Sequence, residues 1–408
     1  MPRIGGTASG ESRGRKHAGW GETAGGAAYS DASVDTHGAA SSIRRSGSKR
    51  ADSICRTAGY VTRMSGGVGG RGREVPSYPD CASLGPQRNR NLHRHRPPSP
   101  MIDPQDILAG AEASGSEVLD CVVVGGGPAG LTAGLYLRRF HRHVRVIDAG
   151  AGRARRISRS HNVAGFPDGV AGVQLLDRMR RHLQLVGGHV ILDTVCHLQR
   201  RADGLFAIGL AHELLWARNV LLCTGVKDRL PALPGADAVE AADLLRYCPV
   251  CDGYEHTGKR IGVIGNSEHG VKEAAFLKNF SADVWFIEVD GRAEDLEHGL
   301  RVAGVRQLPS LARHLAIGHD RHAFVTMDDG EAHRFDVLYA GLGVDPRTQL
   351  AASLGAALDN SGAIVTDAHG RTSVSNLYAA GDVANALDQI GVAEGHATIA
   401  ATAIHNSL

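Results

Sequence analysis

A glycine-rich turn between a buried strand and a helix constrains the fold of this chain more than any other feature. The apolar run at 119–124 leads into Gly125, Gly127 and Gly130 in G-x-G-x-x-G spacing, and a helical pattern follows. In such a unit one glycine makes the tight turn, one lets the backbone approach a pyrophosphate, and one lets the helix pack closely on the strand. The N-terminus of the helix then faces the phosphates. The stretch therefore predicts a dinucleotide-binding βαβ unit.

An acidic residue completes this unit. A second apolar run at 144–147 ends in Asp148, which follows Gly125 by 23 residues. At this position a carboxylate accepts a hydrogen bond from a ribose hydroxyl of the dinucleotide. Strand, glycine turn, helix and acid occur together here, a combination that an ordinary strand–loop–helix does not require.

The same unit recurs in a changed form. A strand pattern at 261–264 is followed by Gly265 and Gly270, then by a helical stretch and a strand pattern that ends in Glu288, again 23 residues after the first glycine. The equal spacing predicts two dinucleotide modules in one chain. Ser267 stands where the middle glycine is expected, and its Cβ would crowd a pyrophosphate. The second module is therefore either a nucleotide site or a structural unit without a ligand.

A third signal lies near the end of the chain, where a strand pattern at 376–380 precedes Gly381 and Asp382. A helix rich in small residues is predicted to start near Gly391. A Gly-Asp pair after a strand is by itself a common turn, so this segment gains meaning only beside the two glycine motifs.

The first hundred residues differ from the rest in composition. They carry 16 Lys and Arg against 7 Asp and Glu, contain no Phe and two Leu, and are rich in Gly, Ser and Arg. Such a segment cannot bury enough apolar surface to offset the entropy of ordering it, so residues 1–116 are predicted to be a disordered basic extension. Three interpretations stay open: a nucleic-acid-binding tail, a targeting peptide, or upstream sequence before a natural start at Met101. We favour the third and expect no nucleic-acid partner.

Apolar runs and cysteine spacing bear on the location of the protein. No run of 18 or more apolar residues occurs, so no membrane span is expected. The seven cysteines are scattered and only two are closely spaced, unlike the disulfide framework of a small secreted protein. We therefore expect a cytoplasmic protein.

The two closely spaced cysteines are Cys248 and Cys251 in the stretch RYCPVCDGYE, with Asp252 directly behind them. On a helical turn this spacing brings two Cα atoms within the roughly 7 Å that a disulfide tolerates. A zinc site needs four ligands, and no second CxxC or HxxxH follows at suitable spacing, so no metal is expected. A redox-active pair is favoured over a zinc site or two idle thiols.

Taken in order, GGGPAG at 125–130, CPVCDG at 248–253, the second glycine motif and YAAGDV at 378–383 resemble the flavoprotein superfamily with two dinucleotide-binding domains. A CxxC directly ahead of the second motif is similar to that of low-molecular-weight thioredoxin reductases, whereas glutathione reductase-like members carry their pair after the first motif. The resemblance covers residues 117–408 and includes RSHNVAGFPDG at 159–169 and VLLCTGVKDRLP at 220–231.

This resemblance implies an α/β fold with two Rossmann-like domains, the nucleotide domain being inserted in the FAD domain. The FAD domain would comprise 117–235 and 342–408, and the NAD(P)-binding domain with its CxxC would comprise 236–341. The residues implied to bind FAD are Gly125, Gly127, Pro128, Ala129, Gly130, Asp148, Asn162, Thr224, Gly225, Gly381, Asp382, Gln389 and Ile390. Those implied to bind NAD(P)H are Gly265, Ser267, Gly270 and Glu288.

The resemblance also implies a division of roles in the CPVCD stretch. Cys251 would take electrons from FAD, Cys248 would attack the target disulfide, and Asp252 would protonate the departing thiolate. The implied activity is that of an FAD-dependent thioredoxin-disulfide reductase, which passes electrons from NAD(P)H to a thioredoxin-like protein or a small disulfide. A homodimer and a rotation of the nucleotide domain during the cycle are implied as well.

Two departures from the family leave alternatives open. Glu288 and Asp290 follow the second strand of the nucleotide module, where NADPH-using members generally carry a basic cluster. Carboxylates repel a 2′-phosphate, whereas Glu288 can accept a hydrogen bond from a free 2′-hydroxyl, so NADH is favoured over NADPH. The terminal segment has Asp388-Gln389 where relatives often carry Arg-Gln. The alternatives are an FAD-dependent dithiol oxidase that uses oxygen, and a non-catalytic flavoprotein redox sensor.

Overall fold

The computed structural model describes residues 117–291 and 296–408. The predicted basic extension at 1–116 and the proposed start at Met101 lie outside the described residues. Among the helices within those two ranges, none is long and apolar enough to cross a membrane.

The first glycine motif belongs to a seven-stranded sheet of order β3-β2-β1-β6-β5-β4, with β17 also paired to β6. Its parallel part consists of β3, β2, β1, β6 and β17, and β5 and β4 extend it in antiparallel pairing. The strands are β1 (Val118–Val124), β2 (Val144–Asp148), β3 (Val190–Leu192), β4 (His197–Arg200), β5 (Phe206–Gly209), β6 (Leu214–Leu222) and β17 (Leu377–Ala379).

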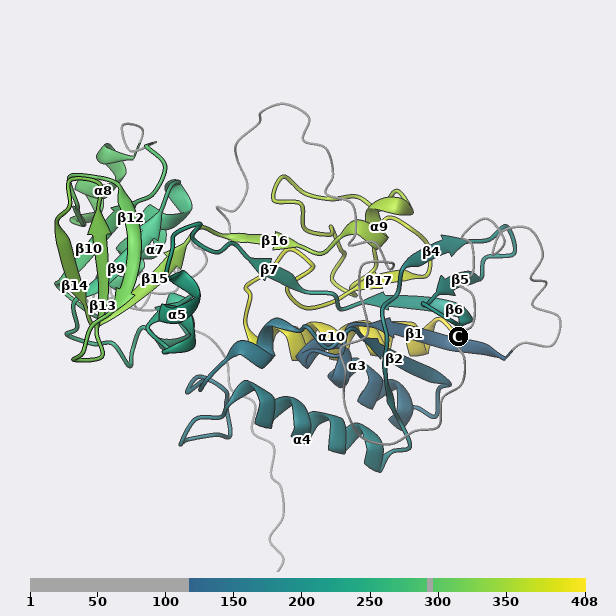
Figure 1. The fold of residues 1–408 in the computed structure, drawn as a ribbon. Helices are drawn as coiled ribbons and strands as arrows, with labels where there is room; N and C mark the ends of the chain where they lie inside the picture. The colour runs from purple at the N-terminus through teal and green to yellow at the C-terminus, as the bar shows by residue number, and fades with distance from the viewer. Residues whose placement is uncertain (1–116, 292–295) are drawn as a thin grey trace, which may run out of the picture. The chain divides into compact units, whose positions relative to one another are not determined.

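Two apolar clusters pack on the two faces of this sheet. Side chains of β1 alternate between them: Cys121 and Val123 pack against helices, and Val122 and Val124 pack in the cluster on the other face. The helices run along one side of the sheet in Figure 1. They are α3 (Pro128–Arg139), α4 (Gly172–Leu185) and α10 (Ile390–Asn406). The short α9 (Gln349–Ser353) contributes to the cluster on the opposite face.

The second glycine motif belongs to a parallel five-stranded sheet of order β11-β10-β9-β15-β8. A three-stranded antiparallel sheet, β12-β13-β14, shares an apolar cluster with it. The strands are β8 (Leu245–Arg246), β9 (Ile261–Gly265), β10 (Val284–Glu288), β11 (Arg306–Gln307), β12 (Ala312–Ile317), β13 (Ala323–Met327), β14 (Ala332–Phe335) and β15 (Val337–Gly341). The helices are α5 (Ala236–Ala241), α6 (Pro249–Asp252), α7 (Glu268–Leu277) and α8 (Glu297–Ala303).

Two short strands carry the chain from one sheet to the other and back. β7 (Val226–Asp228) follows β6, β16 (Val344–Pro346) follows β15, and the two pair antiparallel (Figure 1). The second sheet lies between them in the sequence, so the predicted α/β fold with one dinucleotide unit inserted in another is confirmed. The proposed boundaries after 235 and 341 fall in the connections between β7 and α5 and between β15 and β16, and this division into domains stays a prediction.

Candidate functional site

A cavity of about 1160 Å³ lies where the carboxyl ends of β1, β2 and β6 meet the CPVCD turn. The carboxyl edge of a parallel sheet is the usual ligand-binding edge of such folds. Of the residues expected to bind FAD, only Gly130 is absent from the cavity wall within the described ranges. The predicted residues in the wall are Gly125, Gly127, Pro128, Ala129, Asp148, Asn162, Thr224, Gly225, Cys248, Cys251, Asp252, Gly381, Asp382, Gln389 and Ile390.

The backbone of the first glycine motif leaves open space at the start of α3. Gly125 has φ +110°, and a Cβ built on it would lie 2.2 Å from the carbonyl oxygen of Cys223. A Cβ on Gly130 would lie 1.8 Å from the carbonyl oxygen of Gly125, so only glycine permits α3 to pack this closely. Gly127 precedes the helix as its N-cap residue, and nothing lies within 4 Å of where its Cβ would be. A helix N-terminus that borders open space in this way fits a dinucleotide pyrophosphate.

Asp148 lies beside this motif at the end of β2. It is buried, and its Oδ2 is 3.3 Å from Nη2 of Arg180 on α4. A Cβ on Gly126 would come within 2.7 Å of the Asp148 Cβ, so the neighbouring glycine makes room for the acid. The position in the cavity wall is consistent with the predicted contact to a ribose hydroxyl.

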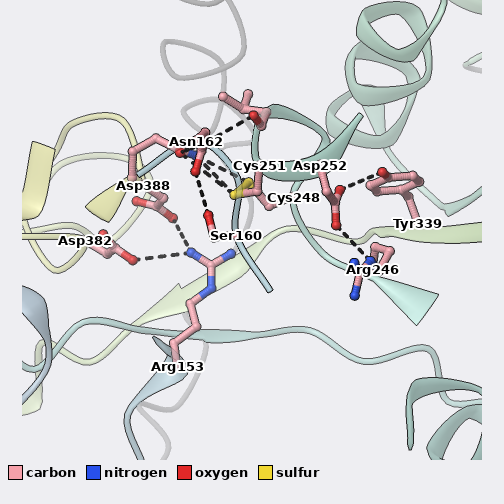
Figure 2. Close-up of a disulfide and its surroundings, with 12 residues drawn as sticks. Arg153, Ser160, Asn162, Arg246, Cys248, Cys251, Asp252, Tyr339, Asp382 and Asp388 are labelled. Atoms are coloured by element: carbon pink, nitrogen blue, oxygen red, sulfur yellow. Dashed lines mark hydrogen bonds and ion pairs between the residues drawn. A yellow bond between two sulfur atoms is a disulfide. The ribbon is translucent and has the colours of Figure 1, made fainter. Parts of the chain in front are cut away.

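Cys248 and Cys251 form a disulfide that faces the same cavity, with their Cα atoms 5.3 Å apart. Cys248 is the N-cap residue of α6, and Cys251 lies within that helix. Gln389 Nε2, at the start of α10, lies 3.3 Å from the Cys248 Sγ and 3.4 Å from the Cys251 Sγ. The predicted pair is thus joined as a disulfide, which Figure 2 shows. Both of its sulfurs contact Gln389, a residue of the terminal segment.

Asp252 lies beside the disulfide, but its carboxylate is turned toward Tyr339 and Arg246 (Figure 2). The Tyr339 hydroxyl donates to Asp252 Oδ1 at 2.6 Å, and Arg246 Nε lies 2.8 Å from Oδ2. Burial raises the pKa of Asp252, while Arg246 and Tyr339 act in the opposite direction. The sequence provided no signal for Tyr339, because it lies 87 residues further along the chain, on β15.

A cluster of charges in the cavity wall was not predicted. Arg153, in the short 3₁₀ helix Arg153–Arg156, lies 2.8 Å from Asp228, 3.3 Å from Asp382 and 3.4 Å from Asp388. Burial raises the pKa of Asp388 to about 7, and the neighbouring Asp382 adds to the effect. The only sequence signal was the basic run RARR shortly after Asp148, and a run of exposed arginines would have the same pattern.

The second glycine motif lies outside this cavity wall. A Cβ on Gly265 would lie 2.7 Å from the Phe286 ring, and one on Gly270 would lie 2.8 Å from the carbonyl oxygen of Gly341, so the close packing of a dinucleotide unit is retained. Ser267 occupies the N-cap position of α7 in extended backbone, as Gly127 does before α3.

Glu288 ends β10 as predicted, and it is 5% exposed. Its Oε2 is 3.4 Å from Gln307 Nε2, and its Oε1 has no hydrogen-bond partner in the described part of the chain. Asp290, the second predicted acid of this edge, accepts a hydrogen bond from Asn266 Nδ2 at 2.8 Å. The carboxyl end of β10 therefore carries two carboxylates. One oxygen of Glu288 has no hydrogen-bond partner among the described residues.

Comparison with known proteins agrees with this arrangement. The chain matches the family model "Pyridine nucleotide-disulphide oxidoreductase" over residues 119–397. A thioredoxin reductase from Streptomyces clavuligerus is 28% identical over 281 residues, which cover 66% of this chain and 87% of the relative. A thioredoxin reductase from Treponema pallidum (strain Nichols) is also 28% identical, over 302 residues that cover 70% of this chain and 95% of the relative.

A solved structure shows the same fold. The crystal structure of thioredoxin reductase from Streptococcus pyogenes MGAS5005 has a TM-score of 0.63 and 26% identity, and the match covers 71% of this chain and 97% of that one. The family match spans more than half of the chain and includes both glycine motifs and the disulfide. The chain therefore belongs to the pyridine nucleotide-disulphide oxidoreductases, and among them to the thioredoxin reductase-like FAD/NAD(P) oxidoreductases.

Proposed function

We propose that this protein is an FAD-dependent reductase of a thioredoxin-like disulfide, with NAD(P)H as the electron donor. The observation that carries the proposal is the position of the Cys248–Cys251 disulfide in the wall of the cavity formed by the first glycine motif. A disulfide in that position borders the space that fits the dinucleotide, so a flavin bound there could pass electrons directly to the two sulfurs.

The bound flavin would supply two-electron transfer, and the chain's own residues would handle the sulfur chemistry. Two electrons and two protons convert the disulfide into a dithiol, with cleavage of the bond between the two sulfurs. The thiolate of one cysteine then attacks a sulfur of the substrate disulfide, and a mixed disulfide forms. Attack by the other cysteine restores the internal disulfide and releases the substrate as a dithiol. We assign the flavin-facing role to Cys251 and the attacking role to Cys248.

Asp252 is the proposed proton donor and acceptor for these thiols. Its raised pKa suits such a role, because an acid with a pKa nearer to the working pH is protonated more often. In this structure both carboxylate oxygens are engaged by Tyr339 and Arg246. Arg246 lies on β8 and Tyr339 on β15, both in the second sheet, and the CPVCD turn follows β8 in the sequence. The rotation of the nucleotide domain that the family resemblance implies would therefore move all three residues together. Proton transfer by Asp252 requires in addition a local rearrangement of its side chain.

For the electron donor we propose NADH in preference to NADPH. The support is the acidic edge of β10, where Glu288 has an unsatisfied buried oxygen and Asp290 adds a second carboxylate. A free ribose hydroxyl can donate to such an acceptor, whereas a 2′-phosphate is repelled by it. The cytoplasmic location, the homodimer and the absence of nucleic-acid partners remain predictions.

The dithiol oxidase is the second candidate, and the same edge favours it. Ser267 and the two acids depart from the usual nucleotide site, so electrons would instead enter from a small dithiol and leave to oxygen. In that reaction the dithiol substrate becomes a disulfide and oxygen becomes hydrogen peroxide. The internal disulfide and the flavin would carry the same two electrons in the opposite direction.

Anaerobic flavin spectroscopy separates these candidates. NADH should bleach the flavin absorbance, and a thioredoxin disulfide added afterwards should restore it. Cys251→Ser should keep the bleaching by NADH and lose the reoxidation by disulfide, and Cys248→Ser should do the same if the substrate is attacked by this sulfur. If a dithiol bleaches the flavin anaerobically, neither NADH nor NADPH does so, and the reduced protein consumes oxygen once air is admitted, the protein is the oxidase and not the reductase.

A further inference from the structure

The Gln389 carboxamide contacts both sulfurs of the disulfide. Its Nε2 lies 3.3 Å from the Cys248 Sγ and 3.4 Å from the Cys251 Sγ, so one amide group faces both reacting atoms. Gln389 immediately precedes α10, in extended backbone at the N-cap position. A disulfide sulfur is a weak acceptor, whereas a thiolate is a charged one and makes a stronger, charge-assisted hydrogen bond.

A second amide determines which end of Gln389 faces the sulfurs. Asn162 Nδ2 lies 3.4 Å from the backbone carbonyl oxygen of Val250, which can only accept a hydrogen bond. The same Nδ2 donates to Gln389 Oε1 at 2.9 Å, and Ser160 Oγ lies 2.7 Å from Asn162 Oδ1. Because the Val250 carbonyl requires a donor, Asn162 presents its NH₂ to Gln389 as well. Gln389 then presents its oxygen to Asn162 and its NH₂ to the sulfurs.

We propose that Gln389 is a catalytic residue that donates a hydrogen bond to the cysteine thiolate formed when the disulfide opens, and that Asn162 is its positioning residue. This proposal deepens the proposed function and rests on it. When the disulfide takes up two electrons and one proton, the bond between the sulfurs breaks and leaves one thiol and one thiolate. The negative charge then lies on a sulfur that the Gln389 NH₂ already faces. Because the two distances differ little, the same donor serves a thiolate on either cysteine.

This contact has two measurable consequences. A donor to the thiolate favours the charged form, so it lowers the pKa of the reactive thiol. It also stabilises the reduced protein relative to the disulfide, since the thiolate is the better acceptor, and therefore raises the reduction potential. Removal of the donor should reverse both effects together.

The first experiment measures the thiol pKa in the purified protein. The protein is reduced with dithiothreitol under anaerobic conditions, and the rate of alkylation by iodoacetamide is followed from pH 5 to 10, with mass spectrometry to identify the labelled cysteine. Gln389→Leu should raise the apparent pKa by about one unit, which slows alkylation at neutral pH roughly tenfold. Gln389→Glu keeps the shape but places a carboxylate beside the sulfur, so it should raise the pKa further. A pKa in Gln389→Leu that equals or lies below the native value overturns the proposal.

The second experiment measures the potential against dithiothreitol. In this equilibrium the internal disulfide becomes a dithiol while dithiothreitol becomes its cyclic disulfide, so no nucleotide or substrate is involved. A tenfold shift in the equilibrium constant corresponds to about 30 mV, and Gln389→Leu should be more negative by about that amount. An unchanged or more positive potential contradicts the proposal.

Variants at two further positions complete the test. Asn162→Ala should shift the pKa in the same direction as Gln389→Leu, and a native value there would remove the positioning role from Asn162. Gln184→Leu, at an exposed position of α4, is the matched control and should leave both quantities unchanged. Neither measurement needs NAD(P)H or a substrate disulfide. Failure of this proposal is therefore distinguishable from failure of the proposed function, which appears only in flavin bleaching and substrate turnover.

Discussion

Asp388 is one of three carboxylates around the Arg153 guanidinium in the cavity wall. The ion pairs measure 3.4 Å to Asp388, 3.3 Å to Asp382 and 2.8 Å to Asp228, and one arginine cannot compensate three negative charges. The neighbouring Arg156 adds a second cation, but it pairs with Asp228 and with Glu240. We therefore expect the ionised form of Asp388 to destabilise the folded protein, and Asp388→Asn to relieve that effect.

The direction of the pH dependence follows from the two states of Asp388. Its pKa is about 7 in the folded protein, against an ordinary value of 3.8. Between these pH values the folded protein binds more protons than the unfolded chain, so the free energy of unfolding falls as the pH rises. The stabilising contribution is complete below about pH 4 and is lost as the pH passes through 7. Asparagine does not ionise, so this loss is absent from the variant.

The size of the effect has an upper limit set by the shift. Roughly three pKa units at about 1.4 kcal/mol each give about 4 kcal/mol. The Asp388 side chain is 29% exposed, and water screens part of this energy. Loss of the hydrogen bond to Arg153 offsets roughly another 1 kcal/mol. We expect Asp388→Asn to be more stable than the native protein at pH 8 by about 1 to 2 kcal/mol, which is a rise of roughly 2 to 3 °C in Tm for a protein of this size.

Thermal unfolding from pH 5 to 8.5, at matched flavin content, measures this difference. The native Tm should fall across the range while that of Asp388→Asn stays more nearly constant. Asp177→Asn removes the same charge from an exposed i,i+3 pair with Arg180, where the Asp177 side chain is 66% exposed, and should change the Tm by less than about 1 °C. If Asp388→Asn is no more stable than the native protein at pH 8, the electrostatic reasoning about this cluster is wrong.

Three further predictions follow from single contacts. Gly130→Ala places a Cβ 1.8 Å from the Gly125 carbonyl oxygen, so it should destabilise the protein by about 1 to 3 kcal/mol and reduce the flavin content. Gly395→Ala is the control, because a Cβ there meets nothing within 4 Å. Equal flavin content and equal Tm in the two variants would contradict this interpretation of the glycine motif. Tyr339→Phe removes the 2.6 Å hydrogen bond that lowers the pKa of Asp252. The alkaline limb of the pH profile of kcat for disulfide reduction should therefore move to higher pH by up to about one unit. A profile that moves to lower pH would exclude Asp252 as the proton donor. Glu288→Gln removes the charge at the end of β10, so the preference for NADH over NADPH, measured as the ratio of the two kcat/KM values, should fall about tenfold. An unchanged ratio would show that Glu288 does not discriminate between the two nucleotides.

The two dinucleotide units could be predicted from the sequence because their signals are local. Gly125 needs a positive φ, and Gly130 has no room for a Cβ, so each position allows one residue type and shows it in the sequence. The apolar strand patterns around them ended within a residue of the observed β1, β9 and β10. The disulfide could be predicted for the same reason, because Cys248 and Cys251 are only three positions apart in the sequence.

Tertiary structure alone decided what surrounds those units. Asn162, Cys251 and Gln389 come from distant parts of the chain, and only the folding of the terminal segment against the CPVCD turn makes their amides and sulfurs neighbours. The same is true of Tyr339 and Asp252, and of the three acids around Arg153. A hydrogen bond or an ion pair depends on distances of a few ångströms between side chains, and residue types in a sequence do not encode those distances. The sequence determined which chemistry this chain can carry, and the packing of its two dinucleotide units decided which residues contact the disulfide and Asp252.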